Sequence, residues 1–235
     1  MAEEVKDKQK MLKKLEQDLE KLNIITRQFN IFKVLKSEEY EIRHSNFLAW
    51  LMRPNENHGL KDYFLKEFLK SAIKDYTNNV EIEVKLRDII FYDFSDIRIN
   101  REDNHIDILL VSYKSKFVCV IENKIDSGEN GTQLSRYAEY IENNFKEYKK
   151  LFIYLSKETN NNELIPRSIK DKTVYYIPMC YEQVKDVINN VLKFKSSNLN
   201  NEVKIFIEHY KKNIERYIMN NTDEETKNII IIKKQ

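Results

Sequence analysis

The chain has 235 residues, of which 41% are hydrophobic and 33% are charged, and it includes 14 Tyr and 12 Phe. This composition excludes a disordered chain and predicts a globular protein with a packed aromatic core. Lys and Arg number 40 against 38 Asp and Glu, which leaves a formal net charge of +2. Any contact with nucleic acid therefore depends on a local basic patch rather than on the field of the whole molecule.

The cysteines and the N-terminus bear on the compartment. Cys119 and Cys180 lie in apolar, strand-like runs without the spacing of a metal or redox motif, which predicts two buried, reduced thiols. The opening residues MAEEVKDKQK are charged rather than apolar, unlike a signal peptide, and no apolar run reaches the length of a membrane span. We therefore expect a cytoplasmic protein with no membrane partner.

The first third of the chain has helical periodicity. Within residues 3–35, leucines recur at three- and four-residue steps among charged side chains, which predicts an amphipathic helix. These leucines are Leu12, Leu15, Leu19 and Leu22. Such a stripe is typical of a docking surface or of a contact within a homo-oligomer. Further helices are expected over 37–54, ended by Pro54, and over 60–73.

After residue 79 the pattern changes to runs rich in Ile and Val, which favour strands. Strands are predicted over 80–86, 96–100, 105–113, 116–125, 151–156 and 173–180, and helices over 132–145, 182–194 and 202–219. Helices, a β-meander, a crossover helix and further strands together predict an α/β sandwich, in which helices flank a mixed central β-sheet. We expect an N-terminal amphipathic segment (1–36), one main domain (37–222) and a C-terminal tail (223–235).

Charged side chains stand at the end of the apolar strand predicted over 116–125. Because side chains alternate along a strand, Glu122 and Lys124 share one face, and Asn123 takes the other. The preceding strand carries Asp107. A symmetric turn midway between the two strands pairs Asp107 with Glu122, with their β-carbons about 5 Å apart.

Facing carboxylates repel each other, so the pair of Asp107 and Glu122 is unfavourable in a protein without a cation. A hard cation reverses this effect, and Mg²⁺ is commonly held by one or two carboxylates while it keeps waters and phosphate oxygens as its other ligands. The pattern predicts a Mg²⁺ site, with Mn²⁺ as a substitute, where Lys124 orients a water or neutralises charge on a phosphate. The alternative for Glu122 and Lys124 is a structural ion pair at a strand end.

Asp107, the hairpin and Glu122-Asn123-Lys124 resemble the PD-(D/E)XK nuclease superfamily, in which an aspartate and an ExK motif form a metal-dependent phosphodiesterase centre. More narrowly, RHSNFLAWLMRPNENHG (43–59), IDILL and IENKIDSGENGTQLSRYAEYI resemble a bacterial family of that superfamily whose roles are mostly undefined. The similarity covers roughly residues 30–185. It implies a restriction-endonuclease-like fold for the main domain, with extra helices at both ends. One departure is that Ile106, rather than proline, precedes Asp107.

The resemblance implies two further site residues. Glu41 matches an acidic residue that such nucleases often add to the metal shell, although its charged surroundings are also typical of a solvated helix face. Gln133 matches the glutamine of a QxxxY pattern with Tyr137, four residues apart on one helical face. A role near the substrate is expected for Gln133, with a helix cap as the alternative, and packing is expected for Tyr137.

The sequence thus favours a Mg²⁺-dependent nuclease that hydrolyses phosphodiester bonds, with DNA as the expected substrate. Its expected catalytic residues are Asp107, Glu122, Lys124, Glu41 and Gln133, and its expected metal ligands are Asp107, Glu122 and Glu41. Two alternatives come from other classes of protein. One is a non-catalytic nucleic-acid-binding or regulatory protein that retains the nuclease fold. The other is an interaction module built on the N-terminal helices, with a vestigial site.

Overall fold

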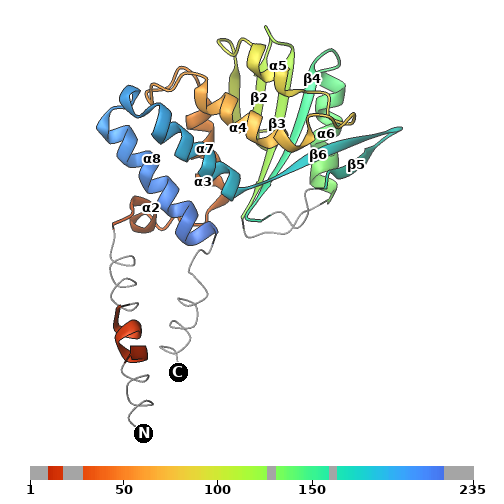
Figure 1. Cartoon of the computed structure of the whole chain (residues 1–235). Coiled ribbons are helices and arrows are strands. Elements are labelled where there is room, and N and C mark those ends of the chain that lie inside the picture. The colour runs from red at the N-terminus through yellow and green to blue at the C-terminus, as the bar shows by residue number, and fades with distance from the viewer. Residues whose placement is uncertain (1–9, 18–28, 126–130, 159–162, 220–235) are drawn as a thin grey trace.

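The computed structural model describes residues 10–17, 29–125, 131–158 and 163–219. The strands are β1 (Arg98–Asp103), β2 (Ile106–Ser112), β3 (Phe117–Lys124), β4 (Lys149–Ser156), β5 (Ile165–Ile169) and β6 (Lys172–Cys180). The α-helices are α2 (Ile31–Val34), α3 (Glu41–Met52), α4 (Tyr63–Ile73), α5 (Leu86–Phe91), α6 (Gly131–Asn144), α7 (Tyr181–Phe194) and α8 (Asn201–Asn213), and α8 continues into a π-helical turn, Ile214–Ile218. The fold is an α/β sandwich around a mixed sheet, as predicted (Figure 1).

The strands form one six-stranded sheet in the order β1-β2-β3-β4-β6-β5. The pairs β1–β2, β2–β3 and β5–β6 are antiparallel, whereas β3–β4 and β4–β6 are parallel. A parallel pair requires a crossover, which α6 supplies between β3 and β4. Strand β3 lies inside the sheet, and all of its residues except Lys124 are buried.

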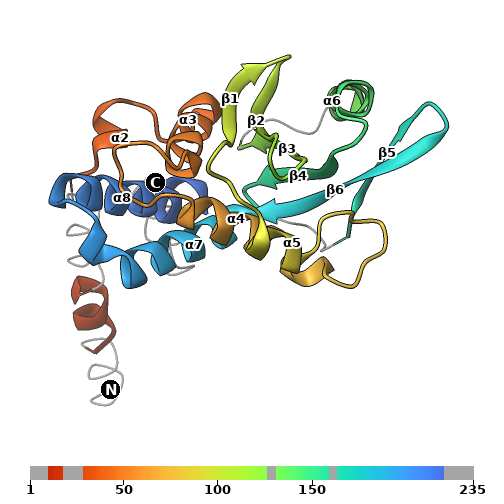
Figure 2. The ribbon, with the colours of Figure 1, turned by 90° about the horizontal axis from the view of Figure 1, so that it is seen from above.

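Helices cover the two faces of the sheet unequally. Figure 2 shows α3, α4, α7 and α8 gathered on one side of the sheet and α6 on the other. Cys119 and Ile121 belong to the larger core under the first group, while Val118 and Val120 belong to the smaller core under α6. The alternation expected for β3 is therefore confirmed, and Glu122 follows the face that α6 covers.

Asp96 fixes the hairpin that joins β2 and β3. Its carboxylate accepts hydrogen bonds from the hydroxyl of Ser112 (2.7 Å) and from the backbone N–H groups of Tyr113 (3.0 Å) and Lys114 (2.8 Å). The resulting four-residue turn sets the register from Ser112 opposite Phe117 to Ile108 opposite Ile121. This is the predicted symmetric register, and its continuation brings Asp107 to Glu122.

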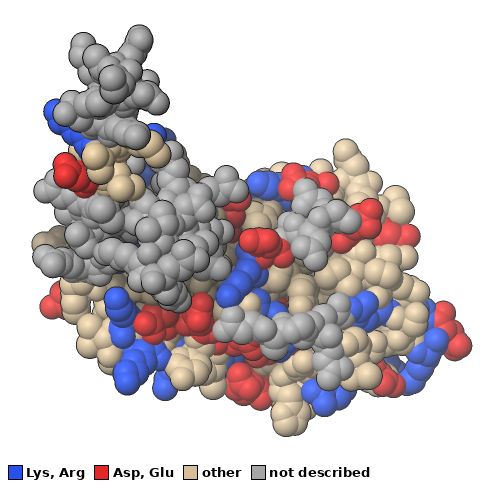
Figure 3. Space-filling view, turned by 90° about the horizontal axis from the view of Figure 1, so that it is seen from below, with Lys and Arg blue, Asp and Glu red and all other residues tan. Residues whose placement is uncertain are grey.

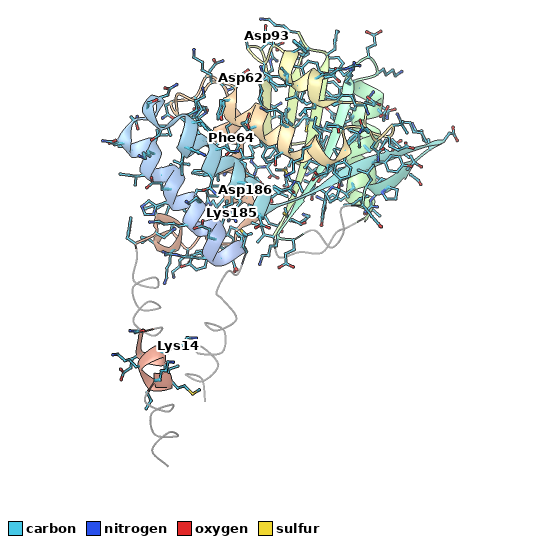
Figure 4. The ribbon with its side chains drawn as sticks, viewed as in Figure 1. Lys14, Asp62, Phe64, Asp93, Lys185 and Asp186 are labelled. Carbon is cyan, nitrogen blue, oxygen red and sulfur yellow. The ribbon has the colours of Figure 1, made fainter. Side chains whose placement is uncertain are left out.

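The two ends of this hairpin differ in role. Asp93, labelled at the top of Figure 4, lies at the turn end, where its carboxylate contacts the ammonium of Lys114 at 3.4 Å. The charged ends of the two strands lie at the other end of the sheet. Phe64 of α4, also labelled in Figure 4, is fully buried and belongs to the larger core.

The prediction of a strand over 80–86 is wrong. Ile82 and Val84 alternate with exposed or half-buried neighbours because they pack into the larger core, but this segment pairs with no strand among the described residues. A carboxylate oxygen of Glu83 accepts the backbone N–H of Lys150 at 3.0 Å, so a side chain takes the place of a backbone ladder. Burial at alternate positions indicates an apolar face, not strand pairing.

Two other elements were not predicted. Helix α5 begins at Leu86, where Asp88 accepts the backbone N–H of Lys85. Strand β5 contains Pro166, which is tolerated because this strand is at the edge of the sheet. The expectation of two buried thiols holds for Cys119 but not for Cys180, which is only half-buried at the end of β6.

The N-terminal region is described in part. Residues 10–17 are helical, and Leu12 and Leu15 are exposed. The rest of the predicted leucine stripe and the tail at 223–235 lie outside the described residues. Phe32 of α2 is buried and packs edge-on against Phe47 of α3, with ring centroids 5.7 Å apart. Within the described ranges, no helix is long and apolar enough to cross a membrane.

Candidate active site

The charged ends of β2 and β3 meet the first turn of α3. Asp107 is the second residue of β2, Glu122 and Lys124 close β3, and Glu41 is the first residue of α3. These four side chains were expected in one site from the sequence. The structure brings all four together, and Gln133 lies nearby in the first turn of α6.

Glu122 is a fully buried carboxylate with little compensation. Its Oε1 lies 2.8 Å from Nζ of Lys124, yet neither carboxylate oxygen has a hydrogen-bond partner of acceptable geometry among the described residues. Burial raises the pKa of Glu122 to about 7, and the negative charge of Asp107 adds to this effect. A carboxylate buried with a second carboxylate beside it is costly to keep charged, even with the ammonium of Lys124 in contact.

Lys124 lies between two carboxylates. Its ammonium is 2.8 Å from Oε1 of Glu122 and 3.8 Å from Oε2 of Glu41, and its side chain is only 14% exposed. Burial acts to lower the pKa of Lys124, but the contact with Glu122 and the charges of Glu41 and Asp107 together outweigh burial. The pKa is therefore raised, and Lys124 stays a cation at neutral pH.

Asp107 is held from two directions. Its Oδ2 accepts the backbone N–H of Asn123 at 2.8 Å, and its main-chain carbonyl accepts a hydrogen bond from the guanidinium of Arg101 on β1. Burial raises the pKa of Asp107, although the hydrogen bond from Asn123 and the charge of Lys124 oppose this effect. The same guanidinium reaches Asn46 of α3, with Nε 3.0 Å from Oδ1, so Arg101 joins β2 to α3.

Glu41 is anchored to the end of β3. Its Oε1 accepts the backbone N–H of Ile125 at 2.8 Å, while its Oε2 faces Lys124. Because α3 begins at Glu41 rather than at residue 37, this side chain projects from the first turn of the helix. At that position the partial positive charge of the helix N-terminus favours a carboxylate.

Gln133 is linked to the site through Tyr137. Its Nε2 donates to the hydroxyl of Tyr137, which in turn donates to the main-chain carbonyl of His105 in the β1–β2 turn. Burial raises the pKa of Tyr137, and the negative charges of Glu122 and Asp107 contribute. Tyr137 is buried in the smaller core, as expected, and its hydroxyl also accepts the amide of Gln133.

The donor set suits a divalent cation, although the carboxylates do not converge fully. Across the described ranges, no group of three or more His, Cys, Asp or Glu side chains is placed to hold a metal ion together. However, Glu122 offers buried carboxylate oxygens for which the described residues supply no hydrogen-bond partner, and Asp107 lies beside it. Carboxylate oxygens are the ligands that Mg²⁺ prefers. A cation bound here would compete with the ammonium of Lys124 for Glu122.

A family model described as the PD-(D/E)XK nuclease superfamily matches residues 29–212. The chain belongs to the PD-(D/E)XK nuclease superfamily. The match runs from just before α2 to the end of α8, so it includes the whole sheet and the site of this PD-(D/E)XK protein. No curated protein and no solved structure matches the chain.

The roles of two residues around the PD-(D/E)XK site were not identified from the sequence. Arg101 donates to the main-chain carbonyl of Asp107. Every residue has such a carbonyl, so the pattern of residue types in the sequence does not indicate this contact. Asn123 was placed only on the opposite face of β3, where its side chain meets Ser45 of α3. The sequence did offer one indication of this role: Asn123 is an amide in a strand predicted to be buried, and a buried polar side chain requires hydrogen-bond partners.

Proposed function

We propose that this protein is a metal-dependent nuclease that hydrolyses phosphodiester bonds, with DNA as its substrate and Mg²⁺ as its metal. The observation that carries the proposal is the buried carboxylate of Glu122, without hydrogen-bond partners among the described residues, beside Asp107 and Lys124. Membership of a nuclease superfamily supports the reaction class. Perturbed carboxylates next to a fixed cation are also typical of catalytic sites.

The proposed ligands are Asp107, Glu122 and Glu41. A bound divalent cation would supply Lewis-acid stabilisation of the charge on the phosphate. One carboxylate oxygen of Asp107 accepts the backbone N–H of Asn123, and one carboxylate oxygen of Glu41 accepts the backbone N–H of Ile125. These hydrogen bonds fix the two carboxylates before substrate arrives, which lowers the cost of ordering them on binding.

Lys124 is proposed as the electrostatic catalyst. In hydrolysis, the oxygen of water forms a bond to phosphorus and the water loses one proton to solvent, while the bond from phosphorus to the leaving sugar oxygen breaks and that oxygen takes up a proton. Because its pKa is raised, Lys124 remains an ammonium and does not serve as a general base near neutral pH. It can donate a hydrogen bond to the attacking water or to a phosphate oxygen.

Gln133 is proposed to contact the substrate beside the scissile bond. Tyr137 holds its amide at the start of α6, close to the carboxylates. Figure 3 shows basic and acidic side chains interspersed over one face of the molecule, so charge alone marks no path for a nucleic acid on that face. Recognition would then depend on the site itself and on a few local phosphate contacts.

The test is a cleavage assay with purified protein on supercoiled, linear, single-stranded and branched DNA and on RNA. Each substrate is incubated with Mg²⁺, with Mn²⁺ and with EDTA. Cleavage of DNA that requires the metal and is lost in Lys124→Ala supports the proposal. Binding of nucleic acid without cleavage under every condition would instead support the non-catalytic alternative.

A further inference from the structure

Asn123, between Glu122 and Lys124, has a fully buried side chain on the face of β3 opposite the carboxylates. Its amide is satisfied by α3 and α7. Nδ2 donates to the main-chain carbonyl of Glu41 (3.2 Å) and to Oγ of Ser45 (2.9 Å). Oδ1 accepts from the hydroxyl of Tyr181 (2.9 Å). The side chain therefore fastens β3 to two helices.

The same residue also reaches the other strand of the site. Its backbone N–H donates to Oδ2 of Asp107 at 2.8 Å, so Asn123 bonds to Asp107 through its backbone and to Glu41 through its side chain. Glu122 and Lys124 are its covalent neighbours. One residue thus links four charged groups that come from α3, β2 and β3.

The orientation of the amide is determined by its partners. The Glu41 carbonyl can only accept, so it must face Nδ2, and the hydroxyl of Tyr181 then faces Oδ1. Tyr181 is itself fully buried and packs edge-on against His44, with ring centroids 5.5 Å apart. A side chain without a donor at position 123 would leave the Glu41 carbonyl without this hydrogen bond, and the first turn of α3 would then be held to this strand end through the contact of its carboxylate with Ile125.

We propose that Asn123 is a positioning residue of the active site, which aligns Glu41 and Asp107 with Glu122 and Lys124 for metal binding and catalysis. This inference rests on the proposed nuclease function. Asn123 does not touch the reacting atoms, because its side chain lies on the far side of the strand. It acts through the placement of Glu41 and Asp107, as outer-shell hydrogen bonds do in metal sites.

The test compares Asn123→Leu with a matched control, Tyr181→Phe, which removes one hydrogen bond of the same amide but leaves Glu41 held. Both variants lose buried hydrogen bonds, so both should melt at lower temperature than the parent. Only Asn123→Leu should weaken Mn²⁺ affinity, by about tenfold or more, measured by the electron paramagnetic resonance signal of free Mn²⁺. Its cleavage should show a lower kcat with KM for DNA nearly unchanged.

A double variant covers the case in which Asn123→Leu fails to fold. Asn123→Leu with Tyr181→Phe also removes the buried hydroxyl that Asn123→Leu alone leaves without this partner, which restores part of the lost stability. Mn²⁺ affinity and kcat equal to those of Tyr181→Phe alone would overturn the positioning role. A parent that neither binds Mn²⁺ nor cleaves nucleic acid would instead overturn the proposed function, and the inference with it.

Discussion

The ammonium of Lys124 lies 2.8 Å from Oε1 of the fully buried Glu122. Lys124 therefore supplies the charge that makes a buried carboxylate tolerable when no metal is bound. The contact indicates that Lys124 matters for stability as well as for the proposed chemistry, because removal of one member of a buried ion pair leaves an uncompensated charge.

Lys124→Ala should lower cleavage by about a hundredfold or more, the expected scale for a pre-organised charge in a site shielded from water. It should also lower the melting temperature in EDTA, because Glu122 loses its cation. Mn²⁺ should restore more stability to this variant than to the parent. Thermal melts with EDTA and with Mn²⁺, together with a cleavage assay, check these outcomes.

A matched control is Lys150→Ala, which removes another buried lysine, 3.7 Å from Glu142 and away from the site. That variant should also melt earlier, but its Mn²⁺ response and its cleavage should equal those of the parent. A Lys124→Ala protein that cuts DNA as fast as the parent would remove Lys124 from the mechanism.

Asp107→Asn should match or exceed the stability of the metal-free parent at pH 8. The amide oxygen can still accept the N–H of Asn123, and the repulsion with Glu122 disappears. The variant should lose most of the metal-induced rise in melting temperature, which for the parent corresponds to about 2.7 kcal/mol at a hundred times the dissociation constant. It should also lose nearly all cleavage. An Asn variant that is less stable yet equally active would contradict the nuclease proposal.

The metal-free protein should lose stability as the pH rises from about 4.5 to about 7. Glu122 has an ordinary pKa of 4.5 and a folded-state pKa raised to about 7, so over this range the folded state holds a proton that the unfolded state has released. The free energy of unfolding then falls by up to about 1.4 kcal/mol per pH unit. Urea unfolding in EDTA between pH 5 and pH 8 measures this slope. Glu122→Gln should flatten it, and an unchanged slope in that variant would assign the titration to another group.

Gln133→Ala should lower cleavage by about tenfold while the rise in melting temperature with Mn²⁺ stays at the parental value, because its amide bonds to Tyr137 rather than to the carboxylates. Kinetics and melts on the same preparation separate the two effects. If the variant instead lost its Mn²⁺ response, Gln133 would belong to the metal site rather than to substrate binding.

The fold and the site differ in how far they could be predicted. Alternation along β3 and the symmetric turn after β2 are local patterns, so the faces of the strand and the β2–β3 register followed from the sequence. The segment around Ile82 and Val84 was misassigned because alternate burial does not reveal whether a partner strand exists. The network of Asn123 joins Ser45 and Tyr181, 78 and 58 residues away in the chain, and local periodicity carries no such information.

The unequal covering of the sheet divides the site into two parts, whose backbone amide protons we expect to exchange with solvent at different rates. Glu41, Asp107, Glu122 and Lys124 are tied to α3, β2 and β3. Gln133 and Tyr137 belong to α6, the helix that covers the smaller core in the described part of the chain. Local opening of α6 breaks fewer apolar contacts than opening of the opposite layer, so we expect its amide protons to exchange with solvent earlier. Such an opening would withdraw the proposed substrate contact and leave the charged cluster assembled, so a metal bound as proposed would stay in place through each release of product.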